Sequence, residues 1–155
     1  MKIILLCVGK TRDALLAKAI IRYADRLSHY VGFTLQALPD VKTARSVEQQ
    51  KEAEGAMMLA ALQPADVVVL LDERGRQLTS REFSSDIERR INTGTRRLVY
   101  IIGGPYGFSQ RVYDRADSLL SLSRMTFSHE MVRLFFTEQL YRAMTIMRGE
   151  PYHHD

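Results

Sequence analysis

The fold is decided by a stretch that runs from Leu98 to Ser109 and reads Leu-Val-Tyr-Ile-Ile-Gly-Gly-Pro-Tyr-Gly-Phe-Ser. Its first five residues are apolar or aromatic, which is typical of a strand buried on both faces of a parallel sheet. Gly103 and Gly104 follow, and residues without a Cβ can adopt positive φ and let another molecule approach the backbone. Pro105 cannot continue the strand. Because open α/β sheets bind ligands at such a turn, the stretch predicts a ligand site.

Strands and helices alternate along the whole chain. Apolar runs predict strands at 2–8, 33–38, 66–71, 98–102 and 119–122. Apolar residues at helical spacing predict helices at about 13–27, 46–62, 79–94, 109–119 and 129–148, with a loop at 41–45. Candidate capping residues are Ser46 with Gln49, Thr79 with Glu82, and Ser109. This order predicts an α/β fold with a mainly parallel sheet flanked by helices, in a single domain over residues 1–155.

The charges are unevenly distributed along the chain, whose formal net charge is +4. All five lysines lie in the first third, whereas thirteen of the seventeen arginines lie at or after Arg74. Because the planar guanidinium suits phosphates and bases, the second half is the expected nucleic-acid side. The last helix is apolar nearly all round, so it must be buried on several sides. In a chain of this length, a second copy of the same protein is its expected cover.

Several classes of site are excluded by the composition. Cys7 is the only cysteine, so the chain has no intramolecular disulfide and no multi-cysteine metal site, and its apolar strand makes it a core residue. The terminal His153-His154-Asp155 does not predict a zinc site, because adjacent side chains rarely converge on one ion. No metal is therefore expected. No run approaches transmembrane length and the opening is too short for a secretory signal, which predicts a cytoplasmic protein without a membrane partner.

Two common phosphate-binding motifs are also excluded. Gly9-Lys10-Thr11 looks like the end of a P-loop, but Ile4 stands where that motif needs its first glycine. A nicotinamide dinucleotide fold places its glycine turn after the first strand, whereas Gly103 follows the fourth predicted strand.

Three predicted strand ends stand out as a combined site: Leu71-Asp72, Gly103-Gly104 and the segment 122–127. The residues from Asp72 to Gly75 are expected to form a loop after the third strand. Because the carboxyl ends of parallel strands share one edge of a sheet, these ends are expected to converge on one pocket. Apolar and glycine-rich walls suit a flat heterocycle held by backbone hydrogen bonds.

Four segments closely resemble the ribosomal large subunit methyltransferase H family. They are Ile-Gly-Gly-Pro-Tyr-Gly at 102–107, Leu-Ser-Leu-Ser-Arg-Met-Thr-Phe-Ser-His at 120–129, Glu-Gln-Leu-Tyr-Arg-Ala at 138–143 and Pro-Tyr-His-His at 151–154. The resemblance covers the whole chain. It implies a SPOUT-class fold with a deep trefoil knot at the carboxyl end, where S-adenosylmethionine binds in a bent shape. It also implies a homodimer that acts on the ribosome and methylates N3 of a pseudouridine in the helix 69 loop of 23S rRNA.

The resemblance also assigns roles to individual residues. The implied cofactor-binding residues are Leu71, Gly103, Gly104, Leu122, Ser123, Arg124, Met125, Thr126 and Phe127. The residues implied to lie near the transferred methyl group and the RNA, as catalytic candidates, are His129, Arg142, Tyr152 and His153, with the tail reaching the partner's pocket. Relatives often carry a basic residue where this chain has His154, which is only partly charged at neutral pH.

The implied reaction needs little covalent machinery. A sulfonium carries an activated methyl group, so the protein must align N3 with it and remove the N3 proton. Structural roles remain open for the same residues: His129 at a helix start, Arg142 in a salt bridge with Glu138, and Tyr152 in packing. Two other functions also remain open. One is methylation of another RNA such as tRNA, and the other is RNA binding without catalysis.

Overall fold

The computed structural model describes residues 1–155 and contains one five-stranded sheet with strand order β2-β1-β4-β3-β5. The strands are β1 (Lys2–Val8), β2 (Gly32–Leu38), β3 (Val67–Gln77), β4 (Arg97–Ile102) and β5 (Ser118–Ser121). Every neighbouring pair is parallel. The predicted α/β fold with a parallel sheet is therefore confirmed.

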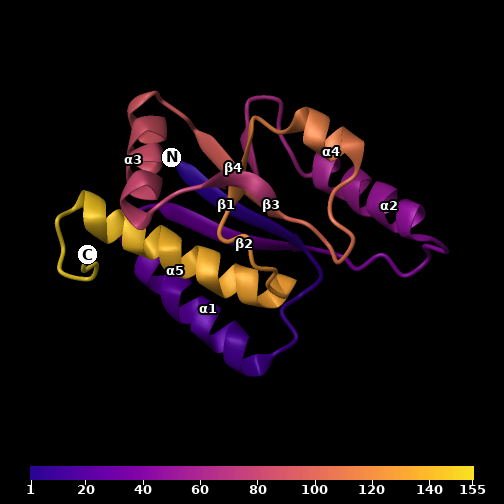
Figure 1. Ribbon diagram of the computed structural model, residues 1–155, viewed down its shortest axis with the longest axis horizontal. Coiled ribbons are helices and arrows are strands. Elements are labelled where there is room, and N and C mark those ends of the chain that lie inside the picture. The colour runs from indigo at the N-terminus through magenta and orange to yellow at the C-terminus, as the bar shows by residue number, and fades with distance from the viewer.

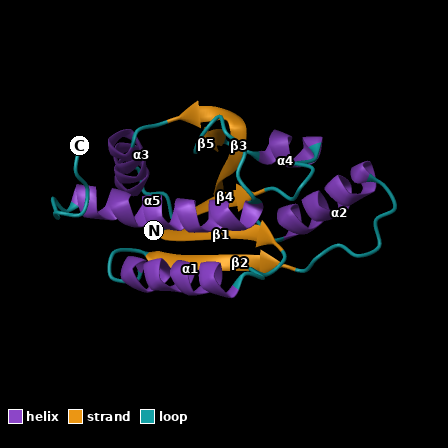
Figure 2. Ribbon diagram, turned by 60° about the horizontal axis from the view of Figure 1, so that its bottom comes forward, coloured by secondary structure: helices purple, strands orange, loops and turns teal.

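Five helices cover the two faces of the sheet (Figures 1 and 2). They are α1 (Ala14–Leu27), α2 (Val47–Ala60), α3 (Ser80–Asn92), α4 (Gln110–Arg115) and α5 (His129–Met147). One hydrophobic cluster joins the sheet to Leu27 of α1, Ile87 of α3 and Phe136 of α5, and a second joins it to Met58 of α2 and Val112 of α4. The sheet is thus the middle of three layers.

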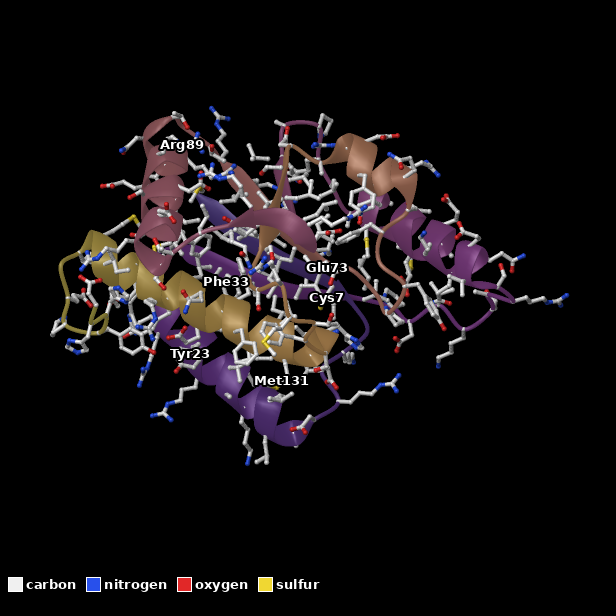
Figure 3. The ribbon with its side chains drawn as sticks, viewed as in Figure 1. Cys7, Tyr23, Phe33, Glu73, Arg89 and Met131 are labelled. Atoms are coloured by element: carbon white, nitrogen blue, oxygen red, sulfur yellow. The ribbon has the colours of Figure 1, made fainter.

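The central strand β4 and the neighbouring β1 contribute side chains to both hydrophobic clusters, one on each face of the sheet. All five residues from Leu98 to Ile102 are buried, because alternate side chains enter opposite clusters. Cys7 at the end of β1 is fully buried, as expected of a core residue, and lies inside the fold in Figure 3. Burial raises the pKa of its thiol. None of the five helices is both long enough and apolar enough to cross a membrane.

The helix ends follow the predicted capping residues with two exceptions. Thr79 and Glu82 form the reciprocal capping box of α3. The Ser46 hydroxyl accepts from Gln49 N, but the Gln49 side chain accepts from Arg45 N, so only half of that predicted box forms. Ser109 stands at the N-cap position of α4 without a side-chain capping bond, because its buried hydroxyl points toward α2.

Strand β3 differs most from the prediction. The expected loop at 72–75 is wrong, since β3 continues to Gln77. The strand pairs with β4 on one side as far as Leu71 and with β5 on the other side from Val69 to Leu71. After a shift in register it pairs with β5 again at Arg76 and Gln77. A Cβ on Gly75 would lie 2.6 Å from backbone atoms of Leu119 and Leu120, so only glycine permits this crossing of two backbones. The knot at the carboxyl end stays a prediction, with which this tight crossing agrees.

Candidate functional site

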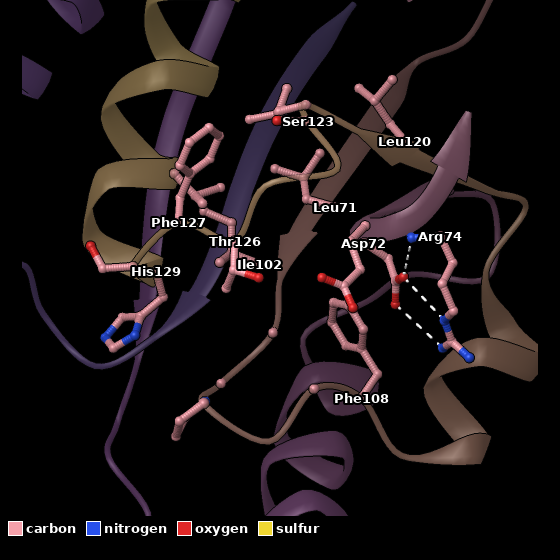
Figure 4. A pocket seen from close by; sticks show the side chains of 18 of the residues that line it. Leu71, Asp72, Arg74, Ile102, Phe108, Leu120, Ser123, Thr126, Phe127 and His129 are labelled. Carbon is pink, nitrogen blue, oxygen red and sulfur yellow. Dashed lines mark hydrogen bonds and ion pairs between the residues drawn. The ribbon is translucent and has the colours of Figure 1, made fainter. Parts of the chain in front are cut away.

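The three strand ends meet at one cavity of about 770 Å³ (Figure 4). It is lined by residues from the end of β3, from the turn after β4 and from the segment that joins β5 to α5. Eight of the nine residues implied to bind the cofactor line this cavity. The ninth, Arg124, does not line it and has an exposed side chain. The predicted convergence is confirmed, and it follows from parallel strands sharing a carboxyl edge.

The glycines of the turn after β4 are explained by close packing. Gly103 and Gly104 do not adopt positive φ, so that part of the prediction is wrong; Gly107 does, at +80°. A Cβ on Gly103 would lie 3.2 Å from the Phe108 ring, and one on Gly104 would lie 2.9 Å from the carboxyl carbon of Glu54. The turn therefore lies between the cavity on one side and buried side chains on the other.

The buried carboxylate of Glu54 lies directly beneath this turn. Glu54 belongs to α2 and is only 2% exposed. Its Oε1 accepts from Gln50 Nε2 at 2.7 Å, while its Oε2 has no hydrogen-bond partner. Nothing in the sequence pattern pointed to Glu54, because the contact is made between distant parts of the chain.

Asp72 is the acidic residue of the cavity wall that accepts the most hydrogen bonds. Its carboxylate accepts a hydrogen bond from Tyr113 Oη and another from the backbone N of Arg74 at 2.8 Å. The Arg74 guanidinium lies 4.9 Å from the centre of the Tyr113 ring and 3.3 Å from Asp72 Oδ1. Burial opposes ionisation, but these hydrogen bonds outweigh it and lower the pKa of Asp72 below its ordinary value. The cavity wall therefore carries an ion pair between Asp72 and Arg74 at neutral pH.

The segment after β5 forms the opposite wall. The Ser121 hydroxyl donates to the carbonyl of Ser123 at 2.9 Å, and Ser123 Oγ accepts from Met125 N at 3.0 Å. These short-range bonds give the segment a fixed shape without regular secondary structure. Its apolar side chains are far from buried: Met125 is 75% exposed and Phe127 is 36% exposed.

His129 lies at the mouth of the cavity, at the first residue of α5. The helix begins there because Ser128 caps it, accepting from Met131 N at 3.3 Å. Figure 4 shows the imidazole at the edge of the group of lining side chains. The structure thus brings His129, alone among the four catalytic candidates, to the cavity of its own chain.

The other three candidates form a separate cluster with Glu138. Arg142 Nη2 lies 2.6 Å from Glu138 Oε1, and the Tyr152 hydroxyl donates to the same oxygen at 2.9 Å. Arg142 Nη1 lies 3.3 Å from His153 Nδ1, and its guanidinium lies 4.8 Å from the centre of the Tyr152 ring. Burial and the hydrogen bonds with Tyr23 and Glu138 raise the pKa of Tyr152, so its phenol stays protonated and donates.

No residue of this tail cluster, defined by Glu138, Arg142, Tyr152 and His153, lines the cavity of the same chain, although Glu138 lines a smaller neighbouring cavity with Leu122 and Phe127. His129 and Arg142 belong to the same helix, and the rise of about 1.5 Å per residue separates their backbones by about 20 Å. Figure 1 shows the C-terminal tail beyond the opposite end of α5. No single chain therefore assembles the whole set of predicted catalytic residues.

Comparison with known proteins defines the class. The family model described as "Predicted SPOUT methyltransferase" matches residues 1–153, and the chain belongs to that family. It is 58% identical over the full length of both chains to the ribosomal RNA large subunit methyltransferase H of Porphyromonas gingivalis. It is 56% identical to the protein of the same name from Christiangramia forsetii, over 99% of each chain.

The fold is also similar to that of solved structures. One of them is a probable methylase family protein from Haemophilus influenzae, which superposes with a TM-score of 0.53 at 12% identity. The superposition covers 95% of this chain and 66% of that one. At this identity the likeness concerns the fold alone. Within this chain, no group of three or more His, Cys, Asp or Glu side chains is placed to hold a metal ion.

Proposed function

We propose that this protein is an S-adenosylmethionine-dependent rRNA methyltransferase. Its proposed target is N3 of a pseudouridine in the helix 69 loop of 23S rRNA, on ribosomes in the cytoplasm. The observation that carries the proposal is the full-length identity of 58% to a ribosomal RNA large subunit methyltransferase H, in a chain whose strand ends form one cavity. We also propose that residues 1–155 form a single knotted domain.

The cavity fits the proposed cofactor in size and chemistry. Its volume of about 770 Å³ falls within the range of roughly 300–1,000 Å³ that is usual for small-molecule sites. Leu71, Ile102 and Leu122 supply flat apolar walls for an adenine ring. The ionised Asp72, paired with Arg74, supplies carboxylate oxygens that accept hydrogen bonds, and the turn at 103–107 lets backbone groups come close.

The chain's own residues then have defined tasks in the reaction. Bound S-adenosylmethionine supplies an activated methyl group, so neither a metal nor a protein nucleophile is required. The segment 122–127 and the glycine turn hold the cofactor from two sides. We propose that His129, which lines the cavity, hydrogen-bonds the incoming base and takes part in removing the N3 proton.

The separation of the tail cluster from the cavity supports a homodimer. A second copy would bring Arg142, Tyr152 and His153 to the mouth of its partner's cavity, since none of the three lines the cavity of its own chain and Arg142 lies about 20 Å from His129. Apolar side chains near that mouth also lack cover: Met125 is 75%, Phe127 36% and Phe135 38% exposed. Sedimentation at micromolar concentration should give about twice the 17.8 kDa chain mass, and a clean monomer would contradict this arrangement.

Transfer of a labelled methyl group tests the function directly. Incubation with labelled S-adenosylmethionine and ribosomes should place the label in 23S rRNA at the pseudouridine, mapped by mass spectrometry of RNA fragments. A label in tRNA would replace the 23S assignment by a tRNA methyltransferase. Failure to transfer any label and to bind the cofactor in calorimetry would leave an RNA-binding domain without catalysis.

Mixed dimers test whether the tail acts on the partner's cavity. Gly104→Ala, which perturbs the cavity wall, and Arg142→Ala, which removes the tail cation, should each be nearly inactive alone. After unfolding and refolding together, half of the dimers carry one intact cavity facing one intact tail, so about a quarter of wild-type activity should return. If each chain used its own tail, mixing would restore nothing.

A further inference from the structure

Two loops follow the carboxyl ends of β1 and β2, next to the first turn of α5. They comprise residues 9–13 and 39–46 and are named here the edge loops. Because Val8 pairs with Leu38 and Leu6 pairs with Ile101, both loops leave the sheet at the same edge as the turn after β4. The side chains of Arg12 and Asp40 approach to 3.5 Å and join the two loops. They therefore form one continuous surface at this edge of the sheet.

The first turn of α5 fixes the first edge loop. Glu130 Oε1 accepts hydrogen bonds from the backbone N of Arg12 and, at 3.3 Å, of Asp13. Arg133, only 1% exposed, donates to the Val8 carbonyl at 2.9 Å and to Thr11 Oγ1 at 3.0 Å.

No carboxylate lies within ion-pair distance of Arg133. A buried cation without a counter-ion is costly, and here its role is to hold the loop. The same helical turn carries His129 and Val132 on the cavity wall, so the loop has a fixed position relative to the cavity.

The edge loops carry three cations that form no ion pair within the chain. Lys10, Lys42 and Arg45 are exposed and form no ion pair, and Arg12 has only its long contact with Asp40. The loops contain these four cations and two acids, Asp13 and Asp40. Asp13 is occupied in capping α1.

The arginines of the second half behave differently. Seven of the thirteen are engaged in ion pairs within the chain: Arg74, Arg81, Arg89, Arg90, Arg97, Arg115 and Arg142. The expected nucleic-acid side is thus in large part neutralised internally, which weakens the prediction that the second half alone meets the RNA.

We propose that the edge loops are an RNA phosphate-binding surface, with Lys10, Arg12, Lys42 and Arg45 as the phosphate contacts. This inference rests on the proposed function, because it assigns part of the substrate path of the same cavity. Exposed cations on a fixed loop bind phosphates without ordering new structure, and each contact releases counterions. The surface then positions the strand that flanks the target nucleotide, while the cavity holds the cofactor.

The test compares two double variants that remove the same charges. Lys10→Ala with Arg12→Ala removes two cations of the first edge loop. Lys18→Ala with Arg22→Ala removes one lysine and one arginine from the exposed face of α1, where neither forms an ion pair. Binding to purified ribosomes is measured by filter retention from 50 to 300 mM salt, and cofactor binding by calorimetry.

The edge-loop variant should bind ribosomes about tenfold or more weakly at 0.1 M salt, and the salt slope of log K should fall by about 1 for each cation removed. Its affinity for S-adenosylmethionine should equal that of the wild type, and Lys10→Arg with Arg12→Lys should restore binding. The control variant should retain the wild-type slope. If the edge-loop variant has the same salt slope as the control variant, the inference is wrong. The proposed function then still holds, provided that the wild type transfers methyl groups. A wild type that neither transfers methyl nor binds ribosomes overturns both.

Discussion

Replacing Gly104 by alanine tests the role assigned to the turn after β4. The new Cβ would lie 2.9 Å from the carboxyl carbon of Glu54 and 2.8 Å from its Oε1. Carbon atoms in contact are normally about 3.5–4.0 Å apart, so one side must move by at least about half an ångström. Glu54 is 2% exposed and held by Gln50, so its carboxylate has little room to move. We therefore expect the turn to shift into the cavity.

The magnitude follows from two costs. Overpacking a tight site costs about 1–3 kcal/mol of folding free energy. A displaced wall also loses its fit to the cofactor, and a misplacement of about 1 Å reduces a well-fitted interaction by up to about 100-fold. Gly104→Ala should therefore raise the Kd for S-adenosylmethionine about 10- to 100-fold, which corresponds to about 1.4–2.8 kcal/mol.

Calorimetric titration with S-adenosylmethionine measures this effect, and urea unfolding measures the stability. Gly32→Ala is the control, because a Cβ there meets no atom closer than 4.0 Å, and it should bind the cofactor normally. Truncation of the opposing side chain, Glu54→Ala, in the Gly104→Ala background should recover most of the lost affinity. Normal binding by Gly104→Ala, or no recovery in the double variant, would refute the steric account.

Three further outcomes are expected. Arg142→Ala should lower kcat for methyl transfer by at least about 100-fold with an unchanged cofactor Kd, because its cluster lies outside the cavity of its own chain; full activity would reduce Arg142 to a helix salt bridge. Arg133→Met should lower the urea-derived stability by about 1–3 kcal/mol, since the part-buried Val8 carbonyl loses its donor; an unchanged midpoint would contradict its role as an anchor. The hydrogen bonds from Arg97 and Gln63 to Asp66 outweigh its burial and place its folded pKa below 3.8, so its stabilisation is complete above the unfolded value and is lost as pH falls below about 4. Asp66→Asn should flatten the acid limb of a stability curve measured from pH 7 to pH 2, and a variant with the wild-type limb would exclude this contribution.

The local elements were predictable because their causes are local. The run from Leu98 to Ile102 is a buried strand on composition alone, and the reciprocal box of Thr79 and Glu82 starts α3 as its spacing requires. The end of β3 was not predictable, since the residues from Asp72 to Gln77 are mostly polar, and Arg76 and Gln77 pair with β5, which follows only after α3, β4 and α4. In this stretch, only Gly75 is a residue type that permits the close approach of the β3 backbone to the β5 backbone.

The position of the cavity was predictable from the sequence, but the separation of the catalytic candidates into two places was not. Parallel strands end at one edge, so Leu71, Gly103 and the segment 122–127 had to meet, and they line one cavity. Tyr113 and Glu54 were missed because they reach the site through contacts between distant segments. Their residue types and spacing are ordinary for helices.

The sequence by itself determined the alternation of elements, the parallel sheet and the position of the cavity, because hydrophobic periodicity and turn residues act over a few residues. The tertiary structure decided three other matters. It placed Arg142 of the tail cluster about 20 Å from His129, it explained Gly104 by its contact with Glu54, and it separated paired arginines from the free cations of the edge loops. Each depends on which distant side chains become neighbours, and that is set only when the layers pack.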